Sequence, residues 1–147
     1  MAADAPVLSC EAPSRATGVA GTKGKRVLYI DDDDAMVFLA SRILEQLGYR
    51  VSGFIDPHRA LAEFHATPGA FDVAVTDLSM PGMSGFQVAH ALHQIRSDLP
   101  ILMTSGYVRS EDRDAARARG IVDLILKPNS AEELGHALDR IFSALAS

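Results

Sequence analysis

The chain has 147 residues, 48% of them apolar, which is enough for one domain with a real core. Its net charge of -5 comes from 14 basic and 19 acidic residues, with no basic stripe to neutralise phosphates, and this argues against direct nucleic-acid binding. Cys10 is the single cysteine, so disulfide frameworks and thiolate metal clusters are excluded and a reducing compartment is expected.

The first 24 residues are rich in Ala, Gly, Ser, Thr and Pro and have no sustained periodicity. This composition predicts a disordered N-terminal leader (1–24) ahead of one domain (25–147). The leader lacks the basic start and continuous apolar stretch of a signal peptide, and no apolar run in the chain is long enough to span a membrane. We therefore expect a cytoplasmic protein without membrane contact.

Apolar strand-like runs then alternate with helical patterns through five βα units. The expected strands lie near 26–31, 50–55, 71–76, 100–104 and 122–126. The expected helices lie near 35–47, 57–66, 84–96, 110–119 and 130–145.

Several helix ends carry recognisable signals. Gly48 stands where the first helix is expected to end, at a position that favours the left-handed backbone conformation. In the second helix Asp56 is the expected N-cap and Pro57 the first helical residue. Ser130 and Glu133 have capping-box spacing at the start of the fifth. The fourth helix is mostly charge and alanine, so we expect it to bury little surface and to be weakly held.

The first, third and fourth strands are continuous apolar runs, as expected of parallel strands covered on both faces. The second strand is more polar and suits an edge. Right-handed crossovers favour a doubly wound parallel α/β sheet with strand order 2-1-3-4-5. Ligands of such sheets bind at the carboxyl ends of the strands, where the chain reverses direction between strands one and three.

Four consecutive aspartates, residues 31–34, follow the first strand directly. Taken alone, the run is most simply a solvated acidic loop, but neighbouring carboxylates repel each other unless water, a cation or a basic group neutralises part of their charge. Asp77 ends the third strand and begins a loop rich in proline and glycine. The predicted topology brings Asp31, Asp32 and Asp77 together, while Asp33 and Asp34 suit the capped first turn of a helix.

Two further polar groups fall at the same edge of the sheet: Ser105 after the fourth strand, and Lys127, followed by Pro128, after the fifth. Every strand end next to the reversal thus supplies a charged or reactive group.

These features together resemble the receiver domain of two-component response regulators, over about residues 25–145. The resemblance consists of the acidic pair Asp31 and Asp32, the loop Asp77-Leu-Ser-Met-Pro-Gly-Met-Ser-Gly, the Ser105-Gly106 pair and Lys127-Pro128, in that order. Spacings of 45, 28 and 22 residues separate Asp32, Asp77, Ser105 and Lys127 in turn. The resemblance to receiver domains implies a flavodoxin-like (βα)5 fold.

The resemblance also implies roles. Asp77 would accept a phosphoryl group from a histidine kinase or a histidine phosphotransfer protein. Mg²⁺, or Mn²⁺ in its place, would be bound by Asp32 and Asp77 directly, by Asp31 through water and by the backbone carbonyl of Ser79. Lys127 and Ser105 would contact the phosphoryl oxygens, and a shift of Ser105 would move the loop and helix that follow.

One departure concerns the output. Many receivers carry an aromatic residue three positions before the lysine, but that position is Leu124 here, and Asn129 replaces another residue that is often aromatic. The chain thus resembles free-standing receivers of the hybrid-kinase kind. We expect it to signal to an unknown downstream protein by contact, without an attached effector domain. Tyr107 either shields the phosphoryl group or merely covers the loop.

Two other functions remain open at this point. Phosphohydrolases with an aspartate nucleophile also use Mg²⁺ on an α/β sheet, but they place a second aspartate two residues later, where this chain has Ser79. We therefore expect no turnover of an external metabolite. A scaffold that keeps the fold without phosphorylation is the third possibility, and the complete set of polar residues argues against it.

Overall fold

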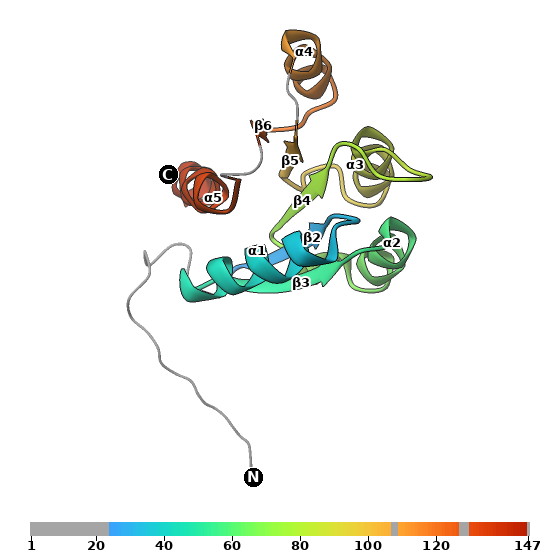
Figure 1. Ribbon diagram of the computed structural model, residues 1–147. Coiled ribbons are helices and arrows are strands. Elements are labelled where there is room, and N and C mark those ends of the chain that lie inside the picture. Colours follow the sequence, from blue (N-terminus) through green and yellow to red (C-terminus); the bar gives the residue numbers. More distant parts are fainter. Residues whose placement is uncertain (1–23, 107–108, 127–129, 147) are drawn as a thin grey trace.

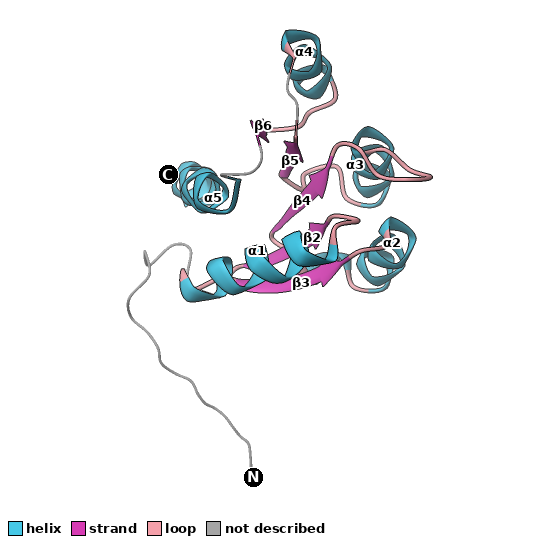
Figure 2. Ribbon diagram, viewed as in Figure 1, coloured by secondary structure: helices cyan, strands magenta, loops and turns pink. Residues whose placement is uncertain are grey.

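The computed structural model describes residues 24–106, 109–126 and 130–146 as a five-stranded parallel sheet between two layers of helices (Figures 1 and 2). The strands are β2 (Arg26–Ile30), β3 (Arg50–Phe54), β4 (Val73–Asp77), β5 (Ile101–Ser105) and β6 (Asp123–Leu126). The helices are α1 (Asp34–Gln46), α2 (Pro57–Ala66), α3 (Gly85–Ile95), α4 (Ser110–Ala118) and α5 (Ser130–Ala146). The predicted leader, Tyr107 and Lys127 lie outside the described residues.

The strands run in the order β3-β2-β4-β5-β6, with every neighbouring pair parallel. This confirms the predicted 2-1-3-4-5 arrangement and places the polar second strand at an edge. The chain leaves β2 in one direction and β4 in the other, so the ends of these two adjacent strands form the switch point of the sheet.

Each face of the sheet is covered by its own helices. One apolar cluster joins the sheet to α2, α3 and α4 through residues that include Phe64, Leu92 and Ala116. The other joins it to α1 and α5 through residues that include Leu44 and Leu138. Because successive strand residues point to opposite faces, Tyr29 belongs to the α1/α5 side while its neighbours Leu28 and Ile30 belong to the other.

The helix-end signals agree with the structure where it describes them. Gly48 follows α1 with φ of 101°, a backbone conformation in which a Cβ would be strained. The Asp56 side chain accepts a hydrogen bond of 2.9 Å from the backbone N–H of His58, and Pro57 opens α2. Both ends are therefore set by local sequence.

The third strand lies further along the chain than predicted. It begins at Val73 and ends at Asp77, because Phe71 makes no ladder pairing and Asp77 pairs with Thr104. A 3-10 turn, Pro68–Ala70, precedes it. The Arg96 guanidinium donates to the Phe71 carbonyl at 2.6 Å and to the Pro68 carbonyl, and so fixes this connection from α3.

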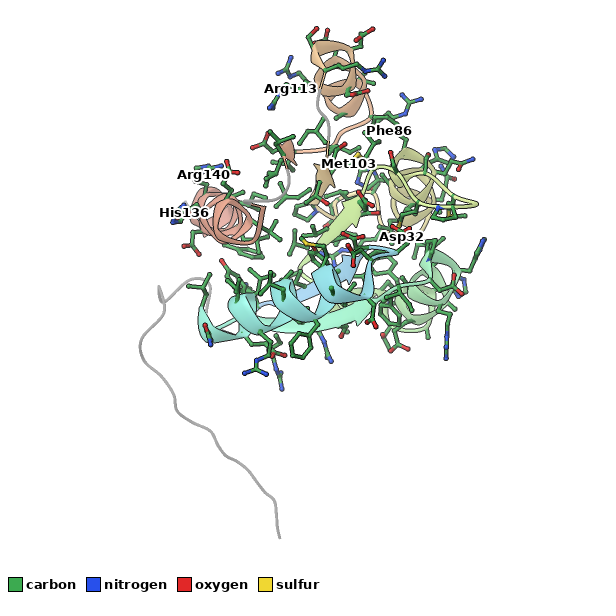
Figure 3. The ribbon with its side chains drawn as sticks, in the orientation of Figure 1. Asp32, Phe86, Met103, Arg113, His136 and Arg140 are labelled. Carbon is green, nitrogen blue, oxygen red and sulfur yellow. The ribbon has the colours of Figure 1, made fainter. Side chains whose placement is uncertain are left out.

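Helix α4 is the least embedded of the helices, as its composition predicts. Ala116 is its one buried residue, and the helix begins with a cap between Arg109 and Asp112. The Arg113 guanidinium donates to the backbone carbonyl of Leu124 at 3.2 Å, which ties α4 to β6. Figure 3 shows Arg113 on α4 and Arg140 on α5, and both pair at long range with Asp123 of β6.

Candidate metal and phosphoacceptor site

Three carboxylates converge at the switch point. Asp31 follows β2 and extends its pairing, since its backbone N–H donates to the Phe54 carbonyl at 3.1 Å. Asp77 is the last residue of β4, next to β2 in the sheet. One oxygen each from Asp31, Asp32 and Asp77 can be chosen so that all three lie within 4.8 Å of one another. The sequence prediction that topology joins these residues is confirmed.

The three carboxylates differ in exposure. Asp31 is fully buried and Asp77 is 5% exposed, whereas Asp32 faces solvent. Figure 3 shows Asp32 at the edge where the strand ends meet the α3 side of the molecule. The trio therefore combines two buried carboxylates with one that is exposed to solvent.

The other two aspartates of the run have a structural task. The Asp33 side chain caps α1 by accepting from the backbone N–H of Ala35 at 3.0 Å and of Met36 at 3.4 Å. The backbone N–H of Asp33 donates to the Asp31 carboxylate at 2.9 Å, and this hydrogen bond fixes the Asp31 side chain. Asp34 lies in the first turn, where the helix dipole favours an acid. The four-aspartate run therefore has two parts: Asp31 and Asp32 belong to the carboxylate cluster, and Asp33 and Asp34 begin helix α1.

The loop after Asp77 is folded tightly against the strand end. The backbone N–H of Leu78 donates to the Thr104 carbonyl, and that of Gly85 donates to the Leu78 carbonyl, both at 2.8 Å. A Cβ on Gly85 would lie 2.4 Å from the Asp77 carbonyl oxygen, so only glycine allows this approach. Ser79 lies exposed in this loop, directly beyond Asp77.

Helix α3 is anchored behind that loop by a capping box that the sequence analysis missed. The Ser84 hydroxyl accepts from the backbone N–H of Gln87, and the Gln87 side chain accepts from the backbone N–H of Ser84 at 2.8 Å. The Ser-x-x-Gln spacing ahead of an apolar stripe was the available signal.

Ser105 ends β5 and is 4% exposed, beside the strand that carries Asp77. Leu124, at the position often aromatic in receivers, is buried in the α2/α3/α4 cluster. Leu126, the last residue of β6, pairs with Ser105, and Lys127 comes next in the chain, outside the described residues. The structure thus places every predicted site residue but Lys127.

The carboxylates also affect a neighbouring tyrosine. Burial raises the pKa of the Tyr29 hydroxyl far above its usual range, and the negative charges of Asp31, Asp77 and Asp33 raise it further. The phenol therefore stays protonated and can act as a hydrogen-bond donor beside the acidic site.

The donor set suits a hard cation. Among the described residues the acidic trio is the one group of three or more potential metal ligands found close together, and all its donors are oxygens. Two oxygens bound to the same Mg²⁺ lie at most about 4 Å apart, so the trio fits with a small closure or with one ligand bound through water. The fold and cluster together define an α/β protein with three carboxylates gathered at its switch point, a set of oxygen ligands that suits a hard cation.

Comparison with known proteins gives the family. The family model for the response regulator receiver domain matches residues 27–139. This chain belongs to the response regulator receiver domain family.

Curated relatives agree. The chain is 31% identical over 134 residues to the transcriptional regulatory protein TcrA of Mycobacterium tuberculosis, covering 91% of this chain and 51% of TcrA. It is 31% identical to the two-component response regulator ARR14 of Arabidopsis thaliana and 30% identical to the sensor histidine kinase GacS of Pseudomonas protegens, covering 29% and 13% of those proteins. The chain thus spans about half the length, or less, of these relatives.

Solved structures show the same fold. The chemotaxis protein CheY4 of Vibrio cholerae superposes with a TM-score of 0.72 at 31% identity, covering 80% of this chain and 98% of that one. A receiver domain from Clostridium thermocellum superposes with a TM-score of 0.77 at 22% identity, covering 83% and 97%. Within the described residues, no helix is both long enough and apolar enough to cross a membrane.

Proposed function

We propose that this receiver accepts a phosphoryl group on Asp77 from a histidine kinase or a histidine phosphotransfer protein. The observation that carries the proposal is the convergence of Asp31, Asp32 and Asp77 within 4.8 Å, at the strand ends of a receiver fold. The Asp77 backbone carbonyl is packed closely against Gly85, which holds the start of the following loop in place.

The transfer is a displacement at phosphorus. An oxygen of the Asp77 carboxylate forms a bond to the phosphorus while the bond from phosphorus to the imidazole nitrogen of phosphohistidine breaks, and the nitrogen leaves with the electron pair. Such reactions depend mainly on positioning and charge neutralisation. The packing of Gly85 against the Asp77 carbonyl holds the nucleophile in place for the donor.

The acidic trio would hold Mg²⁺, with Asp32 and Asp77 as direct ligands, Asp31 acting through water and the Ser79 carbonyl completing the protein ligands. When bound, the ion neutralises the carboxylates and the incoming phosphoryl oxygens. Asp31 is itself fixed by the backbone N–H of Asp33, so its carboxylate is oriented before the ion arrives. Mn²⁺ prefers similar oxygen ligands and would serve in its place.

Ser105 and Lys127 would bind the transferred group. The Ser105 hydroxyl, at the end of the neighbouring strand, would donate to one phosphoryl oxygen, and the Lys127 ammonium would pair with another. The phosphorylated side chain carries roughly one to two more negative charges than the carboxylate. That added charge is what draws Ser105 inward and biases the chain between two arrangements.

The output would pass to helix α4, because little holds that helix. Its described attachments to the rest of the domain include the buried Ala116, the contacts of Arg113 with Leu124 and Asp123, and the Arg119 guanidinium over the Phe86 ring. A shift of the Ser105 segment reaches α4 directly along the chain. A downstream protein would read the altered surface by contact, and GacS, a sensor histidine kinase, shows that a related sequence occurs in a kinase.

Turnover of an external metabolite is not part of the proposal. Phosphohydrolases that use an aspartate nucleophile also need an acid or base near the leaving group. They generally place it two residues after the nucleophile, and here that residue is the exposed Ser79. A serine hydroxyl does not titrate near neutral pH, so Ser79 would not protonate the leaving group of an external substrate as the second aspartate of those enzymes does.

The test is incubation with a small phosphodonor and Mg²⁺, followed by intact-mass measurement. One alkali-labile phosphoryl group should be added to the wild-type chain, and none to Asp77→Asn. Asp98→Asn is the matched control, because Asp98 is exposed, pairs with Arg96 at 2.9 Å and lies before β5, away from the strand ends. Labelling of Asp77→Asn at the wild-type level would overturn the assignment.

A further inference from the structure

Two buried hydroxyls have no hydrogen-bond partner in the part of the chain that the structure describes. They are those of Tyr29 and Thr104, each 1% exposed. The hydroxyl of the nearby buried Thr76, by contrast, donates to the Asp77 carbonyl at 3.1 Å. Buried polar groups without a partner are rare in native proteins, and bound water or an ion usually accounts for them.

Both hydroxyls lie on the same side of the sheet, around Asp77. Tyr29 pairs with Val75, Val75 pairs with Leu102, and all three belong to the α1/α5 cluster. Since side chains alternate along a strand, Asp77 and Thr104, two residues beyond Val75 and Leu102, face that side as well. Asp77 and Thr104 are direct partners in the ladder.

Among the described side chains of the two helices above them, the buried ones are not polar. The α1/α5 cluster contributes only apolar side chains from those helices: Ala40, Leu44, Leu134, Ala137, Leu138 and Phe142. Of the other buried polar side chains among the described residues, Thr76 and Ser105 alternate to the opposite face, which leaves the carboxylates of Asp31 and Asp77 on this side. An ionised carboxylate only accepts hydrogen bonds, and both hydroxyls can donate one.

We propose that Tyr29 and Thr104 bind buried water on the α1/α5 side of Asp77, and that this water orients the Asp77 carboxylate for attack. The hydroxyls donate to the water oxygen, and the water donates to the carboxylate. This gives the water the usual number of partners, about three. Tyr29 and Thr104 are thus positioning residues that act through Asp77 and touch neither the donor nor the ion. The inference rests on the proposed phosphoacceptor role of Asp77.

The variants Tyr29→Phe and Thr104→Val remove the hydroxyls and keep the shape. Each should slow phosphorylation at saturating phosphodonor by about tenfold, because a misplaced nucleophile loses the aligned geometry. The donor concentration at half-maximal rate and the Mg²⁺ affinity should stay within about twofold, since the water contacts neither. The double variant should be less than additive, because both residues serve one water site.

Tyr49→Phe is the matched control. Tyr49 is also a buried tyrosine of the α1/α5 cluster, but its hydroxyl donates to Asp139 at 2.5 Å, and Tyr49 precedes β3 at the opposite end of the sheet. Its removal should lower the urea midpoint of unfolding and leave the phosphorylation rate unchanged. Thr104→Ser keeps a hydroxyl and should restore the rate lost in Thr104→Val.

The closing experiment measures rapid-quench phosphorylation and urea unfolding for wild type and these variants. Slow labelling in Tyr29→Phe and Thr104→Val, with Thr104→Ser close to wild type, supports the water site. Wild-type rates in both hydroxyl deletions, especially with a raised urea midpoint, would mean that the hydroxyls are simply unpaired and would overturn it. Equal slowing in Thr104→Ser would also overturn it, because serine keeps the hydroxyl and the hydroxyl would then not be what sets the rate. If the wild-type chain itself is not labelled, the proposed function fails first.

Discussion

Gly85 lies against the backbone carbonyl of Asp77 so closely that a Cβ at position 85 would come within 2.4 Å of the carbonyl oxygen and 2.9 Å of the Leu78 Cα. Both contacts are with backbone, which cannot swing aside as a side chain can. The first residue of α3 thereby fixes how closely α3 packs against the loop that follows Asp77. Local chain geometry and the chemistry of the site are coupled at this contact.

Gly85→Ala should displace the loop and weaken both folding and phosphorylation. We expect a loss of about 1–3 kcal/mol in the free energy of unfolding, the usual cost of overpacking. The labelling rate should fall with it, because Asp77 moves. Gly69→Ala is the control, since nothing lies within 4 Å of a Cβ there. Urea unfolding of Gly85→Ala that matches Gly69→Ala would contradict the contact.

Asp32→Asn should lower the affinity for Mg²⁺ by at least about tenfold, because it removes one charged ligand of a hard cation. Asp34→Asn changes the same residue type two positions later, in the first turn of α1 and outside the trio. Its Mg²⁺ affinity should equal that of wild type. Isothermal titration with Mg²⁺ measures both, and equal affinity in the two variants would remove Asp32 from the site.

Asp33 should affect stability and not metal binding. Asp33→Ala loses the two hydrogen bonds that the side chain accepts from Ala35 and Met36, at an expected cost of about 1 kcal/mol. Asp33→Asn keeps a capping oxygen and should stay near wild type. The backbone donor to Asp31 persists in both, so Mg²⁺ affinity should not change; a tenfold loss in Asp33→Ala would show that the cap and the site are not separate.

Helix α4 should exchange its amide hydrogens faster than α1 or α3, because it buries a single residue. Arg113→Gln should accelerate that exchange further by removing the donor to the Leu124 carbonyl. Arg117→Gln, on the same helix, removes only a 3.8 Å pair with exposed Asp114 and should have no such effect. Hydrogen exchange with mass spectrometry compares the two variants. Equal exchange rates in α4 of both would show that the Arg113 contact with Leu124 does not hold α4 against β6.

Much of the architecture could be predicted because its causes are local. The period of the apolar residues defined the helices, continuous apolar runs marked the inner strands, and Gly48 and Asp56 marked helix ends that the structure reproduces. The proximity of Asp31 and Asp77 followed from strand order alone, since parallel strands bring their carboxyl ends to one edge.

Other features depend on contacts distant in sequence, and no local pattern encodes them. Arg96 reaches carbonyls 25 and 28 residues earlier, which explains why Phe71 leaves the predicted strand. The closeness of Gly85 to Asp77 depends on how the intervening loop folds. That the hydroxyls of Tyr29 and Thr104 find no partner among the described residues depends on the apolar side chains packed above them, which only the packed structure defines.

The most direct test of the central claim is to locate the modified residue. The chain is phosphorylated with Mg²⁺ and a small phosphodonor, treated with borohydride, which converts an aspartyl phosphate to homoserine, and mapped by peptide mass spectrometry. Homoserine at position 77, abolished when Mg²⁺ is chelated, is the predicted result. Homoserine at another aspartate, or at position 77 to the same extent without Mg²⁺, would contradict the account.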